Sequence, residues 1–195
     1  MNKLLFAVLF VSTLGCLDYT SVTTIKPDGS GSLSFELNIP VKEGNKITFE
    51  GFETRLDTTS GWKTKSFLVD TLDSTQRLRV NGEFSSIVDI GSPMGNREFM
   101  GFSPDSFAFS RQEIESGYRY HYYRSFGFDK NRDVQVSISL PDAGGFVWRE
   151  ELILPGQIVS HNADEERDGK LIWERSTSEV LEKGLVIDVI WEVPG

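Results

Sequence analysis

Few residues in the sequence have the types and spacing that catalysis or metal binding requires. The 195 residues include two histidines, His121 and His161, and one cysteine, Cys16. The histidines lie in different segments without the spacing of zinc ligands, and no Gly-x-Ser-x-Gly motif supplies a serine nucleophile. Glu150 and Glu151 are expected on opposite faces of a strand, where they cannot act together as glycosidase acids do. The sequence therefore predicts no metal centre, no cofactor and no enzymatic activity.

An acidic segment is similar to the start of a calcium-binding loop. Asp164, Glu166 and Asp168 alternate with other residues, and Gly169 holds the sixth position. The twelfth position is Arg175, however, where such a loop needs a glutamate that binds the ion through both oxygens. We therefore predict a solvent-exposed hairpin loop closed by Asp168 and Gly169.

The cysteine is placed for a different chemistry, which is lipidation. Lys3 and an apolar run over residues 4–11 are typical of a cleaved export signal, because the run is too short to span a bilayer permanently. The sequence Thr-Leu-Gly-Cys at 13–16 follows and is similar to a lipobox, although the commonest lipobox has leucine three residues before the cysteine. We expect cleavage between Gly15 and Cys16; the alternative is an ordinary cysteine near a conventional cleavage site. The acyl chains of a lipidated cysteine give stable membrane anchoring.

The predicted organisation has three parts and a single domain. Residues 1–15 are expected to be a lipoprotein signal peptide, residues 16–19 the lipidated N-terminus with a short tether, and residues 20–195 one β-rich domain. The formal net charge is −9, and loss of Lys3 with the signal makes it about −10. Such a surface does not attract phosphate backbones, which argues against nucleic-acid binding. With no second cysteine, the fold depends on apolar burial.

Alternation of apolar and polar residues predicts a mostly β structure. Residues 32–39 alternate without exception, and we expect them to pair with residues 22–26 across a turn at 27–31. Further strands are expected later in the chain, with Trp173, Ile187 and Trp191 on apolar faces of an antiparallel C-terminal meander. These later strands are predicted at residues 134–140, 146–154, 170–174 and 185–193.

Helices are expected to be few. One is predicted within residues 43–58 and a second, short one over residues 176–183. Residues 87–117 lack clean periodicity and are expected to form a long loop or a pair of short elements. Because a one-sided sheet needs a cover for its apolar face, the predicted fold class is α+β, with a curved, predominantly antiparallel sheet and one or two covering helices.

An aromatic segment over residues 117–126 is the most distinctive interior feature. Strand geometry places Tyr118, Tyr120 and Tyr122 on one face. Tyrosines suit a half-buried sheet, so ordinary core packing explains them. Together with Phe146 and Trp148, they could also line a cavity for an acyl chain or another apolar ligand. Both interpretations stay open at this point.

Motifs at the two ends of the chain resemble those of the LppM-like family of bacterial lipoproteins. They are turns and core residues, and they cover about half of the chain. The resemblance implies an α+β domain with a curved antiparallel sheet, likened to lipid-binding folds, and no catalytic residues to carry over. Many members continue into a C-terminal membrane helix, which this sequence lacks, so Cys16 would be its sole anchor. The motifs are the lipobox cysteine, Pro-Asp-Gly-Ser at 27–30, Leu154-Pro155-Gly156-x-Ile158, Asn162-Ala163 and Asp168-Gly169-x-Leu171-x-Trp173.

These features together predict a non-enzymatic lipoprotein anchored in the bacterial cell envelope. We expect it to bind a lipid or other apolar ligand between its sheet and a covering helix. The alternative is a structural lipoprotein with a filled core whose outer face docks an envelope protein. Leu17 follows Cys16 and does not match the aspartate that retains lipoproteins in the inner membrane in one sorting system, which favours the outer membrane in a cell that has one.

Overall fold

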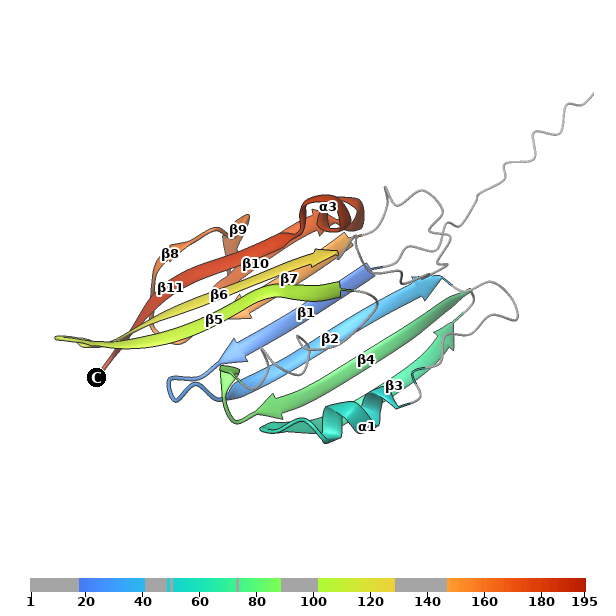
Figure 1. The fold of residues 1–195 in the computed structure, drawn as a ribbon, viewed down its shortest axis with the longest axis horizontal. Helices are drawn as coiled ribbons and strands as arrows, with labels where there is room; N and C mark the ends of the chain where they lie inside the picture. The colour runs from blue at the N-terminus through green and yellow to red at the C-terminus, as the bar shows by residue number, and fades with distance from the viewer. Residues whose placement is uncertain (1–17, 41–48, 50, 73, 89–101, 129–146) are drawn as a thin grey trace, which may run out of the picture.

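A computed structural model describes residues 18–40, 49, 51–72, 74–88, 102–128 and 147–195. Within these residues the strands form a seven-stranded and a four-stranded sheet. The two sheets lie against each other, and one continuous apolar core fills the space between them (Figure 1). The described part of the chain is therefore a two-layer β structure.

The larger sheet, sheet A, has the strand order β3-β4-β2-β1-β7-β10-β9. Its neighbouring strands are antiparallel, with the exception of β1 and β7, which are parallel. The first strand of the chain therefore lies in the middle of this sheet. The bounds are β1 Asp18–Ile25, β2 Gly31–Pro40, β3 Trp62–Leu72, β4 Thr75–Phe84, β7 Val147–Ile153, β9 Glu165–Arg167 and β10 Lys170–Ser176.

The smaller sheet, sheet B, is antiparallel and has the order β5-β6-β11-β8. Two short helices with both ends in the described residues accompany the sheets, α1 (Phe52–Asp57) and α3 (Thr177–Lys183). Helix α3 begins with a capping box, in which the Ser176 hydroxyl accepts from the Glu179 N–H at 3.2 Å. The bounds of the strands are β5 Phe102–Ile114, β6 Gly117–Phe128, β8 Gln157–His161 and β11 Leu185–Pro194.

The predicted N-terminal hairpin is confirmed as β1 and β2. In the turn, the Asp28 carboxylate accepts from the Ser30 hydroxyl at 2.6 Å and from the Ser30 N–H at 2.9 Å, and these hydrogen bonds hold the pKa of Asp28 below its usual value. Gly29 has φ 82°, which a side chain would disfavour. The alternation of β2 then directs Leu33, Leu37 and their apolar neighbours into the core.

The predicted α+β fold class is wrong, although its antiparallel sheet fits. The apolar face of sheet A is covered mainly by a second sheet, because β11 crosses to sheet B and does not continue a meander beside β10. Trp173 of sheet A and Trp191 of sheet B are both buried in the core between them, as is Ile187. Helix α1 covers only one corner, where the Phe52 ring lies 6.0 Å from that of Phe67.

Other expectations have mixed outcomes. Helix α3 confirms the helix predicted at 176–183, and α1 lies inside the range 43–58, of which residues 43–48 and 50 are outside the described residues.

The prediction of loops or short elements at 87–117 is wrong for its second half, because β5 is a long strand. Its Pro104 is tolerated because β5 is an edge strand and its register shifts there. The strand predicted at 134–140 lies outside the described residues.

Candidate functional site

A cavity of about 420 Å³ opens between the two sheets at the edge where β8 faces β9 and β10. Its inner part is apolar, because Leu152 and Leu171 are almost completely buried there. Its outer part carries half-exposed Val159 and the exposed side chain of Glu166. The lining residues are Leu152, Leu154, Gly156, Gln157, Ile158, Val159, His161, Glu166, Gly169 and Leu171.

A β-bulge in β8 directs two side chains toward this cavity. Ile158 pairs with Trp191 and Ser160 pairs with Ile190, so Val159 is an extra residue between them. Residues an odd number of positions apart normally point to opposite faces of a strand. Because Val159 is an extra residue, Ile158 and His161 lie on the same face of β8 although they are three positions apart. Both lie opposite residues of the buried face of β11.

Two tight turns form the rest of the cavity wall. In the β7–β8 turn, Gly156 has φ 84°, and a Cβ there would lie 2.1 Å from the carbonyl oxygen of Glu192. The β9–β10 hairpin has a two-residue loop in which Asp168 and Gly169 both have positive φ, as a type I′ turn requires. The hairpin loop predicted at Asp168 and Gly169 is therefore confirmed.

Polar groups lie at the outer part of the cavity. His161 Nε2 is 3.7 Å from a carboxylate oxygen of Glu166. His161 Nδ1 accepts from the Ala163 N–H at 3.1 Å, so the neutral ring carries its proton on Nε2, toward Glu166. A ligand with a polar end would therefore find a donor and an acceptor beside an apolar interior.

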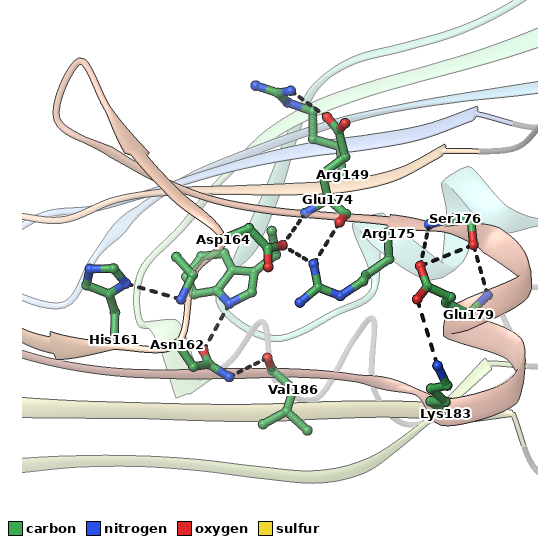
Figure 2. Close-up of polar contacts among 12 residues, drawn as sticks. Arg149, His161, Asn162, Asp164, Glu174, Arg175, Ser176, Glu179, Lys183 and Val186 are labelled. Carbon is green, nitrogen blue, oxygen red and sulfur yellow. Dashed lines mark hydrogen bonds and ion pairs between the residues drawn. The ribbon is translucent and has the colours of Figure 1, made fainter.

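Asn162 fixes the segment that crosses from sheet B to sheet A beside the cavity (Figure 2). Its side-chain oxygen accepts from the Trp173 indole N–H and from the Asp188 N–H, both at 2.9 Å. Its amide donates to the Val186 carbonyl at 2.8 Å. Because these contacts involve β10 and β11, one residue connects both sheets at this edge.

Asp164 is the first acid of the segment that is similar to a calcium-binding loop, and it is paired with a cationic side chain. Asp164 binds Arg175, the residue in the twelfth position, and also accepts from the Glu174 N–H at 2.9 Å (Figure 2). Although burial alone would raise the pKa of Asp164, the hydrogen bond from Arg175 and that from Glu174 lower it. The carboxylate is thus part of a structural ion pair.

Of the predicted lining aromatics, Tyr120, Tyr122 and Trp148 are buried in the core and Tyr118 is partly buried against it; none of these four is among the residues that line the edge cavity. Tyr120 stacks on Trp191 with centroids 5.1 Å apart, and its hydroxyl donates to the Pro27 carbonyl at 2.9 Å. Tyr118 lies beneath the guanidinium of Arg111, at 3.6 Å. These contacts connect β6 to its neighbours and to the β1–β2 turn.

Tyr122 and Trp148, predicted as parts of one lining, approach the core from different sheets. The Tyr122 ring packs edge-on against Phe107, and Trp148 stacks on Tyr19 with centroids 4.2 Å apart. Both side chains are buried. Phe146 lies outside the described residues.

A second polar feature, which sequence analysis missed, is buried in the core. We call it the Glu150 cluster; it consists of Tyr19, Ser21, Tyr122, Arg124, Trp148 and Glu150. Glu150 is only 4% exposed and accepts hydrogen bonds from the Ser21 hydroxyl and from the Trp148 indole N–H, the latter at 3.1 Å. Arg124, from sheet B, interacts electrostatically with this carboxylate across the core.

Burial governs the ionisation of the Glu150 cluster. It raises the pKa of Glu150 above its usual value, against the lowering influence of Arg124, Ser21 and Trp148. Burial also raises the pKa values of Tyr19 and Tyr122. For Arg124, burial favours the neutral form, but Tyr122 and Glu150 outweigh it and raise the pKa. The sequence did contain a signal for this cluster. Glu150 and Arg124 are charged residues at positions where the alternation of their strands places side chains that face the core.

The histidines are not brought together. His121 points to the outer face of sheet B, where its Nε2 lies 2.8 Å from Asp188 and both side chains are nearly half exposed. Ser110 is its cross-strand neighbour. His121 therefore lies on an exposed face of sheet B, whereas His161 lines the cavity, and the two rings have different surroundings.

Among the described ranges, no three His, Cys, Asp or Glu side chains gather as a metal site would require. In the same part of the chain, no helix has the length and apolarity needed to cross a membrane. The described features are thus a β structure with one buried polar cluster and a cavity at its edge.

The described strands thus define the class of the protein by fold: a two-layer β domain with a cavity at one edge. Its fold is similar to that of the folded domain of LppM from Mycobacterium tuberculosis, determined by NMR, with a TM-score of 0.51. The match covers 100% of this chain and 96% of that one at 12% identity, which establishes an LppM-like fold. No family model matches the sequence, and no curated protein matches it.

The C-terminal motifs that carried the sequence resemblance have a common location. Five of their residues line the cavity, and Asn162 and Trp173 form the hydrogen bond beside it. The motifs therefore build the turns, the crossing segment and the wall of one site. The five lining residues are Leu154, Gly156, Ile158, Gly169 and Leu171.

Proposed function

We propose that this protein is a non-enzymatic lipoprotein of the bacterial envelope that binds a single-chain amphiphile in its edge cavity. The observation that carries the proposal is the division of the cavity into an apolar interior and a polar outer part. The acyl chain contacts Leu152 and Leu171, and the polar end meets His161 and Glu166. An LppM-like fold supports the proposal only at the level of architecture.

The dimensions of the cavity suit a small ligand. Its volume of about 420 Å³ falls within the range of roughly 300–1,000 Å³ typical of small-molecule sites. Such sites combine apolar surface with polar groups that fix the orientation of the ligand, and this cavity has both kinds of surface. The proposal therefore moves the ligand from the tyrosines of β6 to the edge between β8 and β10.

The anchor in this proposal is Cys16, lipidated after cleavage behind Gly15. An apolar run followed by a lipobox-like sequence supports it. The signal peptide is then absent from the mature protein, and the acyl chains on Cys16 hold the protein at the membrane. Leu17 after the cysteine favours the outer membrane where one exists. Mass spectrometry of the mature N-terminus tests this part.

Native mass spectrometry of residues 18–195, which include every described strand, tests ligand binding. The probe is a dansyl-labelled lysophosphatidylethanolamine added at increasing concentration. We expect a discrete one-to-one adduct that Val159→Arg removes, because the new cation fills the outer part of the cavity. The matched control is Val186→Arg, a similarly exposed valine on β11 outside the cavity lining. An adduct that survives Val159→Arg unchanged would contradict the proposal.

A docking role is the second candidate, and one observation favours it. The edge strand β3 exposes Leu68, Val69 and Leu72, of which Leu72 is 62% exposed. Exposed apolar residues on an edge strand are a template for pairing with another chain. If docking is the function, the double change Leu68→Lys and Leu72→Lys abolishes partner capture by the purified protein from an envelope extract and leaves the probe adduct intact.

A further inference from the structure

The position of the cavity relative to the anchor determines where its ligand comes from. Strand β1 begins at Asp18, two residues after Cys16, and two residues span at most about 7 Å. The start of β1 lies at the same end of the molecule as α3 (Figure 1). Val147, the first residue of β7, is also there, with its N–H 3.3 Å from the Asp18 carboxylate. Lipidation of Cys16 would place this end at the membrane surface.

The cavity lies toward the opposite end. Strands β1 and β7 are parallel, and Leu152 of the cavity pairs with Thr23, which is five residues beyond Asp18. At a rise of about 3.3 Å per residue, this distance is roughly 17 Å. Sheet B gives an independent measure, because Ile158 pairs with Trp191, six residues beyond the start of β11 beside α3, or about 20 Å.

The charge of the protein opposes a tilt that would bring the cavity down to the lipids. Without Lys3 of the signal the net charge is about −10, and in the β9–β10 hairpin the exposed acids outnumber the exposed Arg167; Glu166, at the outer part of the cavity, is more than half exposed. The exposed acids Glu165 and Asp168 lie beside it. An anionic leaflet repels such a surface. The favoured orientation is therefore the one in which the N-terminal end lies at the membrane and the cavity points away from it.

We propose that the cavity takes up its amphiphile from the aqueous side and not from the bilayer that holds the anchor. This inference rests on the proposed function and adds the source of the ligand. The occupant is a single-chain amphiphile that reaches the cavity as a monomer through water. The protein would thus receive material at its distal end while its N-terminal end remains at the membrane.

The orientation can be measured with one fluorescent label. Cys16 is the only cysteine and is blocked by lipidation, so Val159→Cys or Val147→Cys provides a single reactive thiol. Each labelled, lipidated protein is placed in phosphatidylcholine–phosphatidylglycerol vesicles that contain nitroxide lipids. We expect strong quenching of the label at 147 and little quenching at 159. Equal quenching at the two positions would overturn the inference.

The source of the ligand is measured with the same lipidated protein and the dansyl-labelled lysolipid. In one arm the probe is supplied on methyl-β-cyclodextrin, and in the other it is preloaded into the protein's own vesicles; energy transfer from tryptophan reports uptake. We expect uptake from cyclodextrin to be at least about tenfold faster, with Val159→Arg inactive and Val186→Arg active in both arms. Equal or faster uptake from the protein's own vesicles overturns this inference alone. Failure of unanchored residues 18–195 to bind the probe overturns the proposed function as well.

Discussion

Glu150 and Glu151 are neighbours on β7, and the two faces of the strand give them opposite properties. Glu150 faces the core, where burial raises its pKa despite Arg124. Glu151 faces outward and accepts from Arg149 at 2.8 Å and Lys170 at 2.9 Å. Burial acts on Glu151 too, but these hydrogen bonds outweigh it and lower the pKa. The comparison shows that depth in the sandwich, and not the presence of a cation, decides which form of the carboxyl is favoured.

The largest effect on stability is expected from removing the cation that faces Glu150, and removal of a cation that binds Glu151 provides the comparison. Arg124→Met leaves the buried carboxyl of Glu150 without its opposite charge, which typically costs about 3 kcal/mol of unfolding free energy. Arg149→Met on the outer face removes the pair with Glu151 and the pair with Glu174, the latter drawn in Figure 2, and should cost less than about 1 kcal/mol. Urea unfolding measures both. Equal losses would show that the inner and outer faces do not differ in this respect.

A smaller effect is expected from the hydroxyl that binds Glu150. Ser21 is 1% exposed, and Ser21→Ala removes its hydrogen bond to a buried carboxylate, at a cost of about 2 kcal/mol. The matched control is Ser34→Ala, at an outward, partly exposed position of β2, with an expected change within about 0.5 kcal/mol. Thermal or urea unfolding compares the two variants. A neutral Ser21→Ala would argue against a stabilising hydrogen bond to Glu150.

The two carboxyls should also give pH dependences of opposite sign. A raised pKa in the folded state means that the stabilisation from Glu150 is complete below the usual value of 4.5 and is lost as the pH rises through the raised value. The stabilisation from Glu151, whose pKa is lowered, is present above 4.5 and is lost as the pH falls through the lowered value.

Glutamine variants measured by urea unfolding from pH 3 to pH 8 separate these contributions. The wild-type protein should lose stability relative to Glu150→Gln as the pH rises. It should gain stability relative to Glu151→Gln over the same scan. Slopes of the same sign for the two variants would contradict the opposite environments assigned to the two faces.

The smallest effect is expected from Lys170 on the outer face. Lys170→Met removes one ion pair of Glu151 and should cost about 0.5 kcal/mol at low salt. This cost should shrink in 1 M NaCl, because salt screens exposed charges far more than buried ones. The cost of Arg124→Met should change little under the same conditions. A salt-insensitive Lys170→Met would show that the outer pair behaves like the buried one.

Local patterns in the sequence predicted local structure well. The uninterrupted alternation at 32–39 and the Pro-Asp-Gly turn before it predicted β1 and β2, and the short helix expected at 176–183 is α3. The strands β10 and β11 were also located. Each of these signals depends on residues close together in the chain, which is why they could be recognised without coordinates.

Long-range arrangement was not predictable in the same way. Nothing local in Lys170–Ser176 or Leu185–Pro194 indicates that these strands join different sheets, so a meander was expected and the covering layer was assigned to helices. The alternating tyrosines of β6 have a pattern that fits a ligand lining and a core alike; Tyr120 and Tyr122 are buried, and Tyr118 is partly buried. The candidate cavity depends on the bulge at Val159, which is defined only by pairing with β11.

The central place of β1 in sheet A has a consequence for how the chain folds. Ser21 and Glu150, which touch across β1 and β7, are 129 positions apart in the sequence. Closing so long a loop costs chain entropy before any contact repays it, and folds rich in such contacts form slowly. Sheet A therefore cannot be completed until the last third of the chain is present. As the chain emerges from its N-terminal end, the β1–β2 hairpin first has β4 and β3 as partners among the described strands, and β7 joins β1 only later.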